Sequence, residues 1–251
     1  MSRPYEDEST ASPLRSHNFF NALLFPANLT GLAHIGIYSL CFLALSSIQR
    51  IMISNMAIGM GFGIIGFIVT IEMVNYLYHC IRESASGATA APDSLLLDSF
   101  DTSGVSATFG GYFSLQAEYL GVIFPVVICF FPALLYPLFT HRFDVIFFVL
   151  LGAGTFYYPM LQTAAVLFDS STGYNPFIHL ISIIKTFLPY CLLVLEVALV
   201  IAGGVYLVFL VRNALLAAII LFPIHMYMVM VMMHLLGRFY FLHQARLDWE
   251  V

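Results

Sequence analysis

Six long apolar runs limit what this chain of 251 residues can fold into. A helix that crosses the ~30 Å hydrocarbon core of a bilayer needs about 20 mostly apolar residues, so run length predicts which segments can span a membrane. Each of the six runs is long enough to form such a helix. They cover residues 29–48, 51–80, 119–140, 144–168 and 213–236, with one further run lying within 178–211.

The spacing between these runs predicts how the helices are connected. Only a few residues separate the first run from the second, the third from the fourth and the fifth from the sixth, and such short connections favour antiparallel neighbours. The composition agrees with a membrane protein, because only 9% of the residues are charged where a soluble domain has roughly 25%. We therefore predict an all-α fold, a polytopic integral membrane protein with six transmembrane helices in three antiparallel hairpins.

Polarity divides the chain into three parts. Residues 1–27 are predicted to be a polar N-terminal tail that ends in an amphipathic segment lying in the membrane surface. Residues 28–240 are predicted to be the six-span transmembrane domain, in which the Ser-, Ala- and Gly-rich stretch 82–118 forms a solvated loop. Residues 241–251 are predicted to be a short C-terminal tail, also at the interface.

Basic and aromatic residues predict the orientation of the chain. Arg238 and Trp249 belong to the residue types that settle at the level of the lipid headgroups. An even number of spans puts both termini on one side of the membrane, and five Arg residues on that side against three on the other favour the cytoplasm. We therefore expect an integral protein of the cell or inner membrane with cytoplasmic termini. The five are Arg3, Arg15, Arg82, Arg238 and Arg246, and the three are Arg50, Arg142 and Arg212.

Glycines within the second run, in the stretch GMGFGIIGF at 59–67, need an explanation. Gly61, Gly63 and Gly66 have the G-x-G-x-x-G spacing of a dinucleotide site, but that site needs a strand that leads into the start of a helix. Apolar residues on both sides place these glycines in the middle of a span, so we expect no bound nucleotide. Gly59, Gly63 and Gly66 instead share one helix face, where small residues let a neighbouring helix approach closely. The alternative is a kink or a gating hinge.

Ionisable residues within the runs are the candidate functional residues, because a charge near the bilayer centre costs at least ~2.5 kcal/mol. Glu196 lies near the middle of the fifth run, and we expect it to face the interior of the bundle. Glu72, Asn75 and His79 follow one another at i, i+3 and i+7. This spacing predicts a polar stripe that faces protein or, for Glu72 and His79, a position at the helix end that reaches the headgroups. Lys185 precedes Glu196 by about 16 Å of helix, so the two cannot pair on one straight helix.

Histidine and methionine in the last run raise the possibility of a metal or a haem, since imidazole and thioether groups ligate copper and iron. His225 and His234 lie on opposite sides of a helix because they are nine residues apart. The five Met residues of this run fit an adaptable packing surface without a metal. We therefore predict no cofactor and no metal. Haem or metal electron transfer is the third functional hypothesis, and it involves His34, His79, His225 and His234.

Sequence motifs of hydrolases, zinc proteases and nucleotide-binding loops are missing from the chain, so we expect no enzymatic activity. The net charge of −5 offers no basic surface for nucleic acid. The first hypothesis is an accessory or scaffold subunit, whose partners are the lipid bilayer and other membrane subunits or a second copy of itself. The second hypothesis is a transporter or channel for a small solute or protons. Its path would include Glu72, Asn75, His79 and Glu196.

Overall fold

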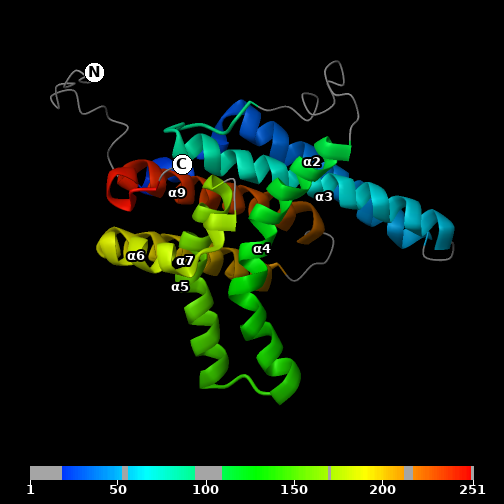
Figure 1. Cartoon of the computed structure of the whole chain (residues 1–251). Helices are drawn as coiled ribbons and strands as arrows, with labels where there is room; N and C mark the ends of the chain where they lie inside the picture. The colour runs from blue at the N-terminus through cyan, green and yellow to red at the C-terminus, as the bar shows by residue number, and fades with distance from the viewer. Residues whose placement is uncertain (1–18, 53–55, 94–108, 169–170, 212–216, 250–251) are drawn as a thin grey trace.

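The computed structural model describes residues 19–52, 56–93, 109–168, 171–211 and 217–249 (Figure 1). Within these ranges the chain is helical apart from short connections, and no described residue belongs to a β-strand. The predicted all-α fold is therefore confirmed for this part of the chain. In chain order the elements are α1 (Phe19–Leu23), the 3-10 turn η2 (Phe25–Ala27), α2 (Leu29–Met52), α3 (Met56–Ala85), α4 (Phe109–Thr140), α5 (Val145–Leu167), the 3-10 turn η4 (Ser171–Tyr174), α6 (Pro176–Lys185), α7 (Phe187–Leu210), the π-helix η5 (Ala217–Leu221) and α9 (Phe222–Leu247).

Four helices in the described part are long and apolar enough to cross a membrane, with mean hydropathies between 1.5 and 2.5. Only 22% to 39% of the most apolar stretch of each helix is buried inside the chain, so most of these side chains need an apolar environment outside it. This finding agrees with an integral membrane protein. The four segments are Leu120–Thr140 in α4, Val145–Leu167 in α5, Phe187–Leu210 in α7 and Ile219–Leu247, which covers part of η5 and all of α9.

The first two apolar runs form α2 and α3, and their bounds differ from the predicted ones. α2 continues through Gln49 and Arg50, because both residue types are good helix formers and do not end a helix. Both ends of the predicted loop 82–118 are also helical, since α3 extends to Ala85 and α4 begins at Phe109. Neither α2 nor α3 is among the four helices identified above in the described residues. Six spans in three hairpins therefore remain a prediction.

A polar turn joins α4 to α5 and is held by Asp144. Its carboxylate accepts hydrogen bonds from the backbone N–H groups of Ile146 at 3.0 Å and Phe147 at 3.5 Å, which caps the first turn of α5. The Tyr136 hydroxyl donates to the other carboxylate oxygen at 2.8 Å. The Tyr136 hydrogen bond, together with the backbone donors and the charge of Arg142, holds the pKa of Asp144 below its ordinary value. Asp144 is therefore ionised at neutral pH, as suits the polar end of an apolar hairpin.

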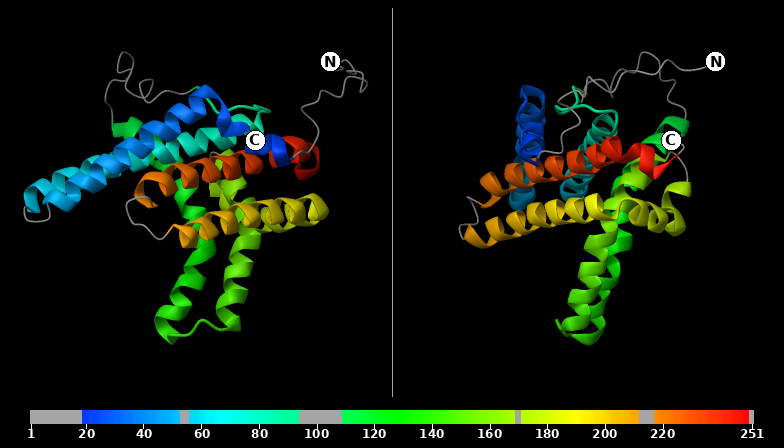
Figure 2. Two further views of the ribbon diagram at one scale, coloured as in Figure 1. Left: turned by 180° about the vertical axis from the view of Figure 1, so that it is seen from behind. Right: turned by 90° about the vertical axis from the view of Figure 1, so that its left-hand side faces the viewer.

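The hairpin of α4 and α5 projects from the other helices and runs across the direction of α7 and α9 (Figures 1 and 2). Its base is packed into the protein, because every residue from Tyr158 to Leu167 in α5 is buried. The two arms approach each other closely at Gly154, where a Cβ atom would collide with the backbone oxygen of Cys129. No other described helix covers the far end (Figure 2). The four apolar helices therefore do not form one bundle with a common axis.

The core of the described fold lies where α9 packs along α3. Gly237 of α9 lies directly against α3, because the backbone oxygen of Ile81 and the side chain of Ser84 occupy the space that a larger residue would need. Small residues permit such close contacts, which matter in a membrane because lipid provides no hydrophobic drive between helices. Just after α3, Gly87 has a φ of +100° and lies against the ring of Phe241. A residue with a side chain would be strained there, so Gly87 allows the chain to turn away from α3.

α9 is the central helix of the described fold, since it also packs against α2, α5, α6 and α7. It continues to Leu247, so most of the predicted interfacial tail 241–251 is helical. The helix ends at Asp248, whose left-handed backbone conformation (φ 54°) changes the direction of the chain. Trp249 follows and reaches α6, where its indole N–H donates to the Ser182 hydroxyl at 2.8 Å.

Replacing Gly237 with Ala is expected to lower the free energy of unfolding by about 1–3 kcal/mol, the usual cost of overpacking a core. The reason is that the added methyl group meets backbone atoms of α3. Thermal unfolding in detergent micelles, followed by circular dichroism, measures the change. Gly36→Ala is the matched control, because a Cβ atom at Gly36 meets no described atom within 4 Å and Ala favours a helix over Gly by roughly 0.5–1 kcal/mol. Equal stabilities of the two variants would contradict the close packing of α9 on α3.

Candidate functional site

Glu196 of α7 belongs to a polar cluster formed by α7, α9 and α3. It is buried, with 5% of its surface exposed, as expected for a residue that faces the interior. Arg238 of α9 is close enough for its positive charge to act on the Glu196 carboxyl group and on His234. His234 and Arg238 share one face of α9 because they are four residues apart. Arg238 therefore places a positive charge near the Glu196 carboxyl group across the contact between α7 and α9.

His234 connects this cluster to α3 through Ser84. The Ser84 hydroxyl donates to the backbone oxygen of Cys80 at 2.6 Å and lies 2.7 Å from Nδ1 of His234. A hydroxyl has one proton, so Nδ1 of His234 carries the hydrogen that is donated to Ser84. The imidazole ring also stacks on Phe25, with 4.0 Å between the centroids. Its Nε2 atom is buried and has no hydrogen-bond partner among the described residues, and in this tautomer it keeps an unshared electron pair.

The polar cluster, defined as Ser84, Glu196, His234 and Arg238, offers charge pairing and proton binding. A carboxylate and a guanidinium group stabilise each other away from water, whereas either one alone is costly there. A neutral imidazole with an unshared electron pair can accept one proton. The cluster therefore links three helices and contains groups that can take up or release protons.

The predicted stripe of Glu72, Asn75 and His79 lies on α3, a different helix from that of Glu196. Glu72 is half-buried, and its backbone oxygen accepts a hydrogen bond from the Tyr38 hydroxyl at 3.2 Å. Asn75 is buried, whereas His79 is exposed. The three side chains therefore lie at different depths in the protein rather than forming one evenly buried stripe, and their role in a path remains a prediction.

An open pocket of about 420 Å³ lies beside the C-terminal end of α3. It is lined by His79, Glu83 and the segment 88–93. This segment is tied to the beginning of α2, where the Thr30 hydroxyl donates to the Asp93 carboxylate at 2.7 Å. Of the four predicted path residues, only His79 lines this pocket. The pocket therefore does not join the stripe on α3 to the polar cluster.

The predicted packing face of Gly59, Gly63 and Gly66 is open where the structure describes it. A Cβ atom at Gly63 meets no described atom within 4 Å, and one at Gly66 meets only Leu45, at 3.8 Å. The surroundings of Gly59 lie outside the described residues. Close helix packing on this face therefore remains a prediction, and it needs a helix beyond those described.

The four histidines of the metal hypothesis lie in separate surroundings. His34 stacks on Tyr76 with 4.0 Å between the centroids, whereas His225 donates from Nδ1 to a backbone oxygen at 2.6 Å. His79 lines the open pocket, and His234 belongs to the polar cluster. Across the described ranges, no group of three His, Cys, Asp or Glu residues is arranged to hold a metal ion. The histidines therefore give the metal and haem hypothesis no structural support.

A further buried histidine, His179 of α6, has both ring nitrogens engaged. Its Nε2 atom lies 2.9 Å from the backbone oxygen of Gly173, and its Nδ1 atom lies 2.5 Å from the Tyr157 hydroxyl. A backbone oxygen only accepts, so Nε2 carries the proton and Nδ1 accepts from Tyr157. Burial lowers the pKa of His179 from its ordinary value, and the hydrogen bond to Gly173 opposes that shift. His179 is therefore a neutral link between α5, η4 and α6.

Sequence reasoning identified Glu196 but not the residues around it. It predicted that Arg238 lies at the headgroup level, which stays a prediction, and it did not predict that this half-buried residue acts on Glu196 through its charge. A signal was present, since His234, Gly237 and Arg238 share one face of α9 and combine a small residue with two polar ones. Ser84 gave no comparable signal, because only the packing of α9 on α3 brings it to His234.

A comparison with known proteins finds no matching protein family, no matching curated protein and no matching solved structure. The function is therefore inferred from the fold and from the polar cluster alone.

Glu196→Gln and Arg238→Gln are each expected to lower the free energy of unfolding, because each change leaves the other charge without its counter-charge. The double variant should lose less than the sum of the two, with a coupling free energy of about 0.5–3 kcal/mol. Unfolding of all four proteins in detergent measures this coupling. The control cycle uses Lys185→Gln and Asp248→Asn, an ion pair at 4.0 Å whose side chains are 43% and 84% exposed. Its coupling should stay below about 1 kcal/mol, and additive effects at Glu196 and Arg238 would show that their charges do not interact.

Proposed function

We propose that this protein is a non-enzymatic, multi-span membrane protein that serves as an accessory or scaffold subunit. Its partners are the lipid bilayer and the helices of other membrane subunits or of a second copy of the chain. It binds neither nucleic acid nor a nucleotide. The position of its polar residues supports this role, and so does the apolar surface that the described helices leave uncovered.

The proposed topology keeps the six predicted spans in three hairpins, with both termini on the cytoplasmic side. Helices that cross one flat bilayer are tilted by about 0–40° from its normal. The topology therefore requires the hairpin of α4 and α5 to lie more nearly along α7 and α9 than it does in Figure 2. Such a change in direction would also move the base of the hairpin, because the side chains from Tyr158 to Leu167 are buried in the protein.

The observation that carries the proposal is that the polar groups of α3, α7 and α9 face one another across helix contacts. Glu196 faces the charge of Arg238, and Ser84 is bonded to His234. None of these four residues lines the open pocket. A transport path needs polar groups that face a water-filled cavity, whereas these groups hold helices together.

The apolar surface supports an assembly role. The far end of the α4–α5 hairpin exposes large side chains on both arms, among them Phe131, Leu138 and Phe148. Large exposed apolar patches mark contacts with membrane or protein. Lipid can cover these side chains, but the open face at Gly63 has the small residues that a neighbouring helix needs. Contact with a further membrane subunit therefore accounts for both features.

Gly63→Leu is expected to weaken assembly by about tenfold, equivalent to about 1.4 kcal/mol, because the larger side chain would hold a neighbouring helix away. Crosslinking in native membranes, followed by native mass spectrometry, measures the assembled fraction. Gly36→Leu is the matched control, since Gly36 is also an exposed helical glycine with no described atom near its Cβ position. Detection of the monomer alone for the unaltered protein would contradict the proposed role.

Proton transport is the second candidate, and the polar cluster favours it. Glu196 is buried in an apolar helix, and the buried imidazole of His234 keeps an atom, Nε2, without a described hydrogen-bond partner. Ionisable residues of this kind occur in the proton relays of pumps and transporters. In this alternative the path runs through Glu72, Asn75, His79 and Glu196.

Proteoliposomes that contain a pH-sensitive dye distinguish the two candidates. An accessory subunit should give a proton flux equal to that of liposomes without protein. A transporter should give a flux that Glu196→Gln lowers by at least about tenfold, since the amide cannot exchange a proton at neutral pH. Glu83→Gln is the control, because Glu83 is exposed and lies in the open pocket. A flux that both variants retain in full would count against a path through Glu196.

A further inference from the structure

The polarity of α6 is the reverse of that found in a helix on the surface of a soluble protein. Its buried face carries polar side chains, including His179 and Ser182. Both make hydrogen bonds inside the protein, as described above. Its outer face is apolar and highly exposed: Phe177 is 73% exposed, Leu180 52%, Ile181 54% and Ile184 75%.

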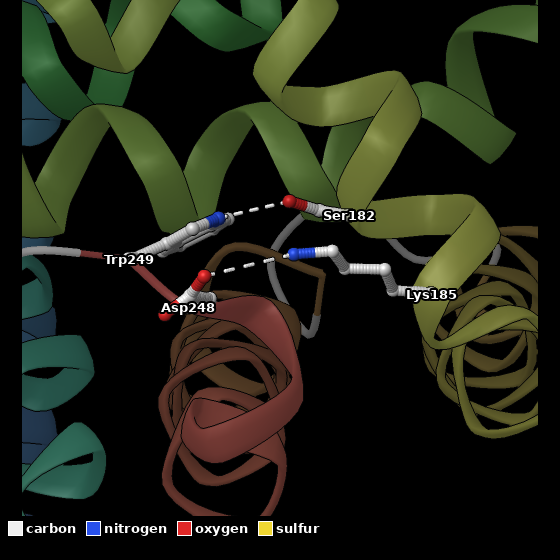
Figure 3. Close-up of polar contacts among 4 residues, drawn as sticks. All are labelled: Ser182, Lys185, Asp248 and Trp249. Carbon is white, nitrogen blue, oxygen red and sulfur yellow. Dashed lines mark hydrogen bonds and ion pairs between the residues drawn. The ribbon is translucent and has the colours of Figure 1, made fainter.

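The length of the helices excludes α6 from a straight span shared with α7. α7 has 24 residues, or about 36 Å of helix, which already exceeds the ~30 Å hydrocarbon core. α6 adds ten more residues, which would lengthen a continuous rod to about 50 Å. The chain leaves the helical conformation at Thr186 (φ −121°, ψ 28°). Figure 3 shows the ribbon changing direction at Lys185, where α6 gives way to α7.

Residues of the type found at membrane interfaces surround the C-terminal end of α6. The indole N–H of Trp249 donates to Ser182, and Lys185 lies 4.0 Å from the carboxylate of Asp248 (Figure 3). The Trp249 ring also stacks on Tyr240, with 5.5 Å between the centroids. Trp, Tyr and Lys settle where hydrocarbon meets the lipid headgroups. The apolar face of α6 also continues into exposed residues of α7, namely Leu188, Leu192, Leu195 and Leu199.

We propose that α6 is an interfacial helix that lies along the membrane surface, with its outer face immersed in phospholipid. Its apolar side chains enter the boundary between headgroups and acyl chains, about 5–10 Å deep. Lys185, at its end, reaches the phosphate groups, and Trp249 lies on the polar side of the helix. This inference rests on α7 being a membrane span, as in the proposed function.

The experiment uses the single Trp of the chain as a depth probe. The protein is reconstituted into phosphatidylcholine vesicles whose acyl chains carry bromine either near the headgroup or near the chain end, and the quenching of Trp fluorescence is compared. The unaltered protein reports the depth of Trp249. In a Trp249→Phe background, Phe177→Trp and Ile184→Trp report the outer face of α6, and Leu199→Trp reports the middle of α7.

Trp at 177 and at 184 should each be quenched about twofold more strongly by the shallow bromine than by the deep one, since an interfacial helix lies at one depth. Trp249 should share this preference for the shallow bromine, because Trp settles at the level of the headgroups. Leu199→Trp should show the opposite preference, because the centre of a span lies about 15 Å from either edge of the hydrocarbon core. The three substituted side chains are exposed, so Trp fits there without repacking. Helicity measured by circular dichroism verifies that each variant is folded. The depth of Trp249 is measured in the unaltered protein, so that measurement does not depend on any substitution.

Four results would overturn the inference or its premise, each in a different way. A difference in depth of about 10 Å between positions 177 and 184, the length of seven helical residues, would show that α6 crosses the membrane. Quenching at these positions by iodide in the water and not by bromine would show that α6 faces solvent, and protection from both would show that protein covers it. Shallow quenching of Leu199→Trp would instead contradict the span of α7, and with it the proposed topology.

Discussion

The packing of α9 along α3 is the contact on which the rest of the described fold depends. Lipid chains are as apolar as the helices, so helices in a membrane associate through close van der Waals contact and hydrogen bonds. Gly237 provides the close contact, and the bond between Ser84 and His234 provides the polar one. With its other faces α9 contacts α2, α5, α6 and α7. The other described helices are therefore arranged around the pair formed by α3 and α9.

The buried charges follow from this arrangement. A lone carboxylate in α7 would be costly among apolar side chains, but α9 places the positive charge of Arg238 opposite Glu196. The same face of α9 carries His234, which is bonded to α3. These contacts favour one relative position of three helices. That is why we place an accessory role before transport.

Lipid as the surrounding solvent explains the two surfaces that would be unfavourable in water. The α4–α5 hairpin exposes apolar side chains over its far end, and Asp144 caps α5 at the polar turn. α6 directs its polar side chains inward, where hydrogen bonds satisfy them, and its apolar ones outward. Both features reverse the usual distribution between core and surface. They are stable where hydrocarbon or the apolar surface of another subunit replaces water.

The sequence alone determined that the chain is helical and apolar, because run length and composition suffice to predict segments that can cross a bilayer. Four predicted spans overlap the long apolar helices, although the last helix extends to Leu247 instead of ending near residue 236, and Glu196 was correctly expected to be buried. The predicted helix ends near Arg50 and in the stretch 82–118 were wrong, because polar residues with a high helix propensity do not end a helix. Only the tertiary structure decided which charge acts on Glu196 and which group is bonded to His234. The physical reason is that these features depend on which helix faces approach closely, and that is set by contacts between residues far apart in the chain, such as Ile81 and Gly237.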